Sequence, residues 1–275
     1  MGTAYAELVR PVRDESNLSS VLLDLIGTSV DSHRIALMPA RLYLPESDFV
    51  RFARLAEILS FRWVVTGGNA QQLEEVYQDA AQLLYSSKGA RAQEAEQLVR
   101  TSFPSDDAFR SAFEREALGY EYVAAYALRK IENYLDGAEK TIKPAQDVHV
   151  EHIMPKTATD FWRERVPEDV AYEEAVSRWG NLTLLLARLN SSISNGDWSA
   201  KRFGNGANAG YGDSKVVLTN DLTGLEDWRY ESVAIRAKWL AELAVRVWAT
   251  EPAQGHVPSL QIAILDPTIL APVQP

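Results

Sequence analysis

Two histidines and a glutamate lie within four residues of each other, in the run Asp147-Val-His-Val-Glu-His-Ile-Met-Pro155. β-branched residues recur in this run, which predicts a short strand over residues 147–153, and the closing proline ends it because it cannot donate a ladder hydrogen bond. Side chains alternate along a strand, so His149 and Glu151 share one face, and His152 falls at the strand's end. Imidazole and carboxylate groups at the end of a strand are typical of a metal-assisted hydrolase.

A second notable segment follows about thirty residues later, Trp179-Gly-Asn-Leu-Thr-Leu-Leu185, with Asn190 just beyond it. Its apolar residues predict a second strand over residues 181–185. Residues 188–193 are expected to begin a helix. The sequence therefore predicts two short strands and a helix that carry polar side chains between them.

The two runs together resemble the HNH (ββα-metal) nuclease motif. More narrowly, they resemble the C-terminal nuclease domain of GmrSD-type modification-dependent restriction enzymes, the group that includes the phosphorothioation-linked SspE proteins. The similarity covers about residues 145–248 and continues through Trp198, Lys201-Arg202-Phe203, Tyr211, Ser214-Lys215, Leu218-Thr219, Leu222, Trp228, Ile235-Arg236 and Leu240. This resemblance implies an endonuclease that nicks or cuts DNA as the effector of an anti-phage restriction protein.

The resemblance also implies roles for individual residues. His152 matches the general base that deprotonates the attacking water, and Glu151 matches an acidic metal ligand. Asn190 matches the second protein ligand, while Asn181 matches the asparagine that ties the loop together and orients the histidine. His149 matches a position that is often histidine in this group, either as a ligand or as support for Glu151. Carboxylate, amide and water ligands suit Mg²⁺ or Mn²⁺.

Charge is distributed unevenly along the chain. The net charge of −10 argues against a surface that binds nucleic acid everywhere. Between Arg178 and Lys215, however, the sequence has five basic residues and only two acidic ones, so this segment is locally basic. We expect phosphate contacts from basic residues in and near this segment; each of them could equally be an ordinary solvated charge. The candidates are Lys156, Arg188, Lys201, Arg202 and Lys215.

Composition limits the class of protein further. The sequence has no cysteine, which excludes disulfides and thiolate metal sites. No apolar run approaches the ~20 residues of a membrane helix, and the N-terminus has no secretory pattern. The sequence therefore predicts a cytoplasmic protein without a membrane partner.

Apolar residues at helical spacing fill the first part of the chain and predict an all-α module of about six helices over residues 1–140. The predicted fold class is α+β, mostly α, in which this module precedes an HNH ββα-metal core with flanking helices at residues 145–250. Pro39 is expected to break the apolar stretch that begins at Arg34. A long helix is predicted over residues 227–248. The Pro-rich tail, residues 251–275, shows little helical pattern and is expected to be extended, docked or disordered.

Two other functions fit the same residues. One is a helical DNA-binding or interaction module with an inactive HNH core, and the other is a ribonuclease of toxin type. Parent proteins of the resembling group usually carry an N-terminal ParB-like nucleotide-hydrolysing sensor with an Asp-Gly-Gln-Gln-Arg motif. That motif is absent from this sequence, so we expect the chain to be a C-terminal piece that works with such a sensor.

Overall fold

The computed structural model describes residues 2–14, 16–115, 120–136, 142–143, 148–186, 189, 195–206, 208–249 and 257–270. Within these ranges the chain is mostly helical and has a single sheet of two strands, which confirms an α+β fold that is mostly α. The elements form two compact units. The first unit contains residues up to Phe109 with Lys143, Trp248 and Ala249, and the second contains the other described residues.

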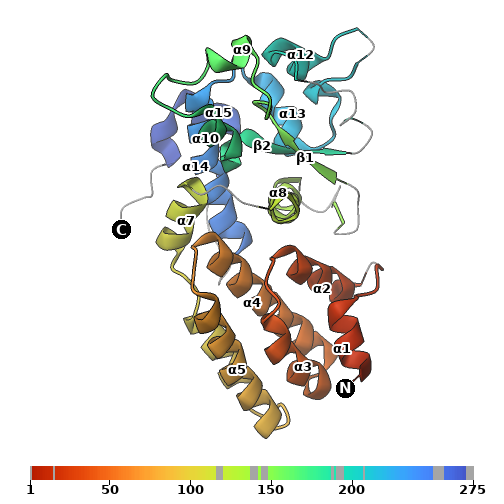
Figure 1. The fold of residues 1–275 in the computed structure, drawn as a ribbon. Helices are drawn as coiled ribbons and strands as arrows, with labels where there is room; N and C mark the ends of the chain where they lie inside the picture. Colours follow the sequence, from red (N-terminus) through yellow and green to blue (C-terminus); the bar gives the residue numbers. More distant parts are fainter. Residues whose placement is uncertain are drawn as a thin grey trace. The chain divides into compact units, whose positions relative to one another are not determined.

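The first unit is built from helices (Figure 1). Their apolar faces meet in one core. Ser16 caps the second helix by accepting a hydrogen bond from the Ser19 amide at 3.1 Å. Asn69 caps the fifth through the amides of Gln71 and Gln72. These caps satisfy amides that have no partner inside the helix, so they fix where each helix begins. The helices are α1 (Gly2–Val9), α2 (Asn17–Gly27), α3 (His33–Tyr43), α4 (Glu46–Val65), α5 (Ala70–Ser86) and α6 (Ala92–Thr101).

The second unit has shorter elements around one long helix, α14 (Tyr230–Val247). Strands β1 (Val148–His152) and β2 (Leu182–Leu186) pair antiparallel, and α8 (Glu121–Asp136) packs against both (Figure 1). The other helices are α7 (Asp106–Arg115, whose first turn belongs to the first unit), α9 (Asp160–Arg163), α10 (Tyr172–Ser177), α12 (Trp198–Phe203), α13 (Val217–Asn220) and α15 (Leu260–Leu265). The 3₁₀ turns are η1 (Trp179–Asn181), η2 (Tyr211–Asp213), η3 (Asp221–Gly224) and η4 (Pro267–Leu270).

The two predicted strands are present within one or two residues of their predicted limits. Asn181 lies in η1 rather than in β2, which begins at Leu182. The helix predicted over residues 188–193 falls outside the described residues except for Leu189. The ββα arrangement of an HNH core therefore remains a prediction.

One local prediction was wrong. Pro39 does not end the segment that begins at Arg34, because α3 continues through it to Tyr43. A proline inside a helix forfeits one backbone hydrogen bond, but α3 buries Ala36, Leu37 and Ala40 completely, and this packing outweighs the loss. The described part of the tail contains a short helix, α15, which Ser259 caps and which packs on α14, so this part is docked, one of the states expected for it.

The division between the compact units falls at Phe109 and Arg110, ahead of residue 140, the predicted end of the helical module. Helix α8 packs on both strands and on α14, and α7 is joined to α14 by the ion pair of Arg110 with Glu242. Phe113 of α7 also stacks on Trp179 with ring centroids 4.4 Å apart. These two helices belong to the structure that holds β1 and β2 in place.

Candidate active site at the end of strand β1

The pairing of the two strands fixes which side chains lie at the end of β1. Glu151 lies opposite Thr183, and His152 lies opposite Leu182. Alternation along the strand places His149 and Glu151 on one face and His152 on the other. The backbone thus offers a carboxylate and an imidazole next to each other, but on opposite faces of the sheet.

His152 is half-buried at the end of the strand. Burial, together with the positive charges of Lys156 and Lys201, lowers the pKa of His152 to about 4. The imidazole is therefore neutral at pH 7, the state in which it can accept a proton.

Glu151 is held by two donors from the segment after β2. Lys201 of α12 donates to its Oε1 at 2.6 Å, and the Tyr211 hydroxyl donates to the same oxygen at 3.1 Å. Lys201 is only 2% exposed, and its Nζ also donates to the His152 carbonyl at 2.9 Å. Burial lowers the pKa of Lys201, whereas the Glu151 carboxylate acts in the opposite direction.

Asn181 joins the loop after β1 to the turn before β2. Its Oδ1 accepts from the Met154 amide at 2.7 Å, and its Nδ2 donates to the carbonyls of Met154 and Val176 at 3.0 and 3.1 Å. Its own carbonyl accepts from the Ile153 amide at 2.9 Å. The side chain is completely buried, so these bonds fix the backbone that follows His152.

Gly180 allows the turn before β2 to press against α14. A Cβ at this position would lie 1.9 Å from the Val233 carbonyl oxygen, a distance that no side chain tolerates. Arg236 of the same helix is completely buried and donates to the carbonyls of Gly180 and Leu182 at 2.8 and 2.6 Å. Helix α14 thus positions the start of β2, because its Arg236 side chain binds backbone carbonyls there.

A complete metal site is not visible in the part of the chain that the structure describes. No group of three or more histidine, aspartate or glutamate side chains lies close enough there to hold an ion. His149 and Glu151 share a strand face, but Asn190, the other predicted ligand, lies outside the described residues. The predicted ligand set therefore stays a prediction.

The basic residues predicted to contact phosphate differ in how accessible they are. Lys156 and Lys215 are exposed, and Arg188 lies outside the described residues. Arg202 donates to the carbonyls of Thr223 and Glu226, which occupies its guanidinium within the fold. Lys201 is buried against Glu151, so the structure does not place it where DNA can reach it.

Sequence reasoning gave no role to Tyr211 or Arg236, although both occur in the similar pattern downstream of the motif. Each acts over a long sequence separation, Tyr211 on Glu151 and Arg236 on β2. The spacing of residues along the chain contained no signal for these contacts.

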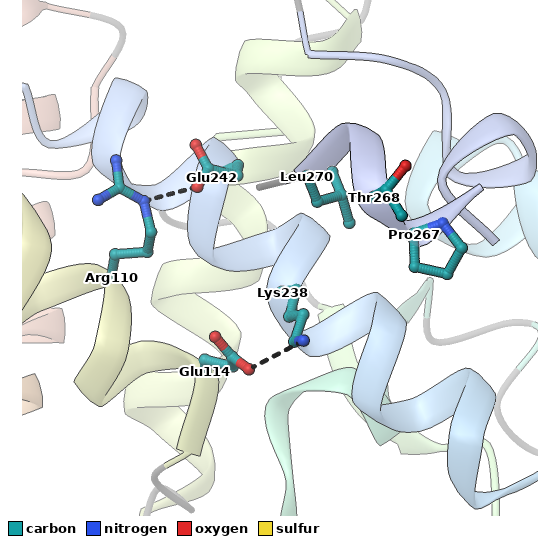
Figure 2. A pocket seen from close by; sticks show the side chains of 7 residues that line it. All are labelled: Arg110, Glu114, Lys238, Glu242, Pro267, Thr268 and Leu270. Atoms are coloured by element: carbon teal, nitrogen blue, oxygen red, sulfur yellow. Dashed lines mark hydrogen bonds and ion pairs between the residues drawn. The ribbon is translucent and has the colours of Figure 1, made fainter. Parts of the chain in front are cut away.

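A separate pocket of about 500 Å³ lies elsewhere in the second unit, between α7, α14 and η4. Figure 2 shows Arg110 paired with Glu242 and Glu114 paired with Lys238 across it. Its lining consists of Arg110, Glu114, Lys238, Glu242, Pro267, Thr268 and Leu270. None of the predicted site residues belongs to this pocket.

Comparison with known proteins gives one family. The sequence profile described as "GmrSD restriction endonucleases, C-terminal domain" matches residues 103–243. A search of curated proteins found no match. Across the described residues, no helix is both long and apolar enough to cross a membrane. The matched range contains α8, both strands, and every side chain that surrounds Glu151 and His152 above. The chain therefore belongs to the family of GmrSD restriction endonuclease C-terminal domains.

Proposed function

We propose that this chain is a metal-dependent DNA endonuclease of the HNH type, the effector of a modification-dependent or phosphorothioation-linked restriction protein that acts against phage DNA. Membership of the GmrSD family indicates a restriction-endonuclease-type function. One observation supports the HNH-type mechanism in particular. A neutral histidine ends β1 beside a carboxylate held by two donors, and Asn181 fixes the loop that follows.

In the proposed reaction, His152 accepts a proton from the attacking water. The water oxygen forms a bond to the scissile phosphorus as the bond to the leaving 3′ oxygen breaks, and solvent supplies a proton to that oxygen. General base catalysis of this kind contributes about 10²–10⁴ in rate. Asn181 limits the movement of the backbone after His152, which keeps the imidazole in one position relative to the water.

In our proposal, Glu151 offers its second carboxylate oxygen to a hard divalent cation. Its Oε1 accepts two hydrogen bonds, while Oε2 accepts none from the described residues. In our proposal Glu151 and His149 hold the ion together with Asn190, and oxygen-rich ligands of this kind suit Mg²⁺ or Mn²⁺. Such an ion would polarise the scissile phosphate and stabilise charge on the leaving oxygen.

The exposed Lys156 and Lys215 are the described candidates for contacts with the DNA backbone. Contacts with phosphate position a duplex without reading its sequence. We therefore expect cleavage with little sequence preference.

Incubation of the chain with supercoiled plasmid in Mg²⁺ or Mn²⁺, beside an EDTA control, tests this function. The expected result is conversion to nicked or linear plasmid that EDTA prevents. An unchanged plasmid at high enzyme excess would favour an interaction module with an inactive core. Cleavage of RNA and not of DNA would favour a ribonuclease.

A further inference from the structure

Lys201 is a buried lysine that the proposed reaction does not use. A lysine ordinarily keeps its ammonium group in water, and removing that charge from water costs several kcal/mol unless partners compensate. Lys201 is 2% exposed, and both of its acceptors belong to adjacent residues at the end of β1. The buried ammonium group of Lys201 thus bonds to Glu151 and to the backbone of His152.

Tyr211 acts on the same carboxylate from a second element. Its hydroxyl lies in a completely buried side chain and donates to Glu151 Oε1, the oxygen that Lys201 also bonds. Two donors on one oxygen fix the rotation of a carboxylate better than one does. The second oxygen, Oε2, is left without a hydrogen bond from the described residues.

A tight loop brings the two donors together. Lys201 lies on α12 and Tyr211 on η2, and the chain between them folds back through Gly204 and Gly210. A Cβ on Gly204 would lie 2.0 Å from the Asn208 carbonyl oxygen, and one on Gly210 would lie 2.3 Å from the Gly204 amide nitrogen. Gly204 also has φ +74°, which favours glycine. The glycines of this segment thus bring two donors to one acceptor.

We propose that Lys201 and Tyr211 are positioning residues for the reaction at the end of β1. Lys201 holds the Glu151 carboxylate and the His152 carbonyl in a fixed relation, and Tyr211 fixes the rotation of the same carboxylate. Neither residue touches DNA. This inference rests on the proposed nuclease function.

Two substitutions remove the contacts one at a time. Lys201→Met keeps the length of the side chain without its charge, and Tyr211→Phe removes a single hydroxyl. Loss of a residue that orients an active-site group typically lowers activity about 10–100-fold. We expect kcat for plasmid cleavage to fall by that factor in Lys201→Met and by less in Tyr211→Phe, with KM for DNA within about twofold of wild type in both.

The double variant and a control sharpen the result. Since both residues hold one oxygen, the loss in the double variant should be smaller than the product of the two single losses. Lys238→Met is the matched control, because Lys238 is also paired with a glutamate in the second unit but is 51% exposed and distant in the chain from β1. Its kcat and KM should equal those of wild type.

Hydrogen exchange gives a readout that does not depend on activity. Lys201 bonds to the His152 carbonyl, whereas Tyr211 bonds only to the Glu151 side chain. The peptide covering residues 148–154 should therefore exchange faster in Lys201→Met and as in wild type in Tyr211→Phe. Where Lys201→Met fails to fold, kcat of Tyr211→Phe decides the matter.

Several results would overturn the inference. A raised KM with unchanged kcat in Lys201→Met would show that Lys201 contacts phosphate instead. An unchanged kcat in Tyr211→Phe would show that the carboxylate does not need the second donor. His152→Ala separates this inference from the proposed function. If that variant cleaves like wild type, the proposed function fails; if it is inactive while both positioning variants keep wild-type kcat, only the inference fails.

Discussion

In the first compact unit, α4 runs for 20 residues and α5 for 17, and both bury apolar side chains, for example Phe49 of α4 and Leu73 of α5. In the second unit, α12 and α13 have only six and four residues, and hydrogen bonds of charged side chains hold these short helices in place. Glu132, for example, is 1% exposed and accepts from the amides of Val217 and Leu218 at 2.6 and 2.9 Å.

This contrast teaches where each unit gets its shape. Long amphipathic helices bury enough apolar area to be stable with few specific polar contacts. Short strands and single turns cannot do so, because much of their backbone lacks partners within the element. In the second unit, buried Lys201, Arg236 and Glu132 supply those partners, so a site built there can be positioned by hydrogen bonds.

The largest effect on stability is expected from Arg236→Met. Burial lowers the pKa of Arg236 to about 9, so it is charged at pH 7, and it donates to the carbonyls of Gly180, Leu182 and Leu218. Its removal leaves these buried acceptors short of a donor, which should cost about 3 kcal/mol. Unfolding in denaturant, followed by tryptophan fluorescence, measures it.

Arg202→Met is the comparison variant, since Arg202 also bonds to carbonyls but is only partly buried. It should cost about 1 kcal/mol or less. Equal stabilities of wild type and Arg236→Met would contradict the view that buried charge holds the second unit together.

A second effect on stability, confined to the first unit, is expected from acid. His33 is 2% exposed, and burial, together with the charge of Arg34, lowers its pKa to about 3. An unfolded histidine has a pKa near ~6.5, so between these values the unfolded state binds the extra proton. Stability is therefore full above pH 6.5 and falls on acidification, by up to roughly 3 kcal/mol between pH 6.5 and pH 4.

The variant His33→Phe, which cannot titrate, should flatten this dependence. Denaturant midpoints of both proteins at several pH values, with hydrogen exchange to locate the opening, measure it. An identical slope in the two proteins would mean that other groups govern the response of the first unit to acid.

The same contrast explains what could be predicted from the sequence. The apolar spacing predicted the helical character of the first part of the chain and the helix over residues 227–248, observed as α14, because amphipathic periodicity is local. β1 was predictable from its β-branched residues and Pro155. The predicted break at Pro39 was wrong, because the local preference of proline against helices does not include the packing of α3 on its neighbours.

The site was predictable only in part. The motif singled out Glu151, His152 and Asn181, and the structure brings these three to adjacent backbone at the end of β1. Lys201 was expected to contact phosphate because a count of charges does not show whether a lysine is buried. Its contact with Glu151 spans 50 positions of the chain and depends on the glycine loop, which only the folded structure shows.

The central claim is that the end of β1 cleaves DNA through His152. The most direct test is the single-turnover rate of plasmid cleavage by His152→Ala relative to wild type at several Mn²⁺ concentrations, with circular dichroism to verify folding. We predict a fall of about 10²–10⁴ that added Mn²⁺ does not restore. A rate within twofold of wild type, or one that recovers with added Mn²⁺, would contradict the assignment of His152 as the general base.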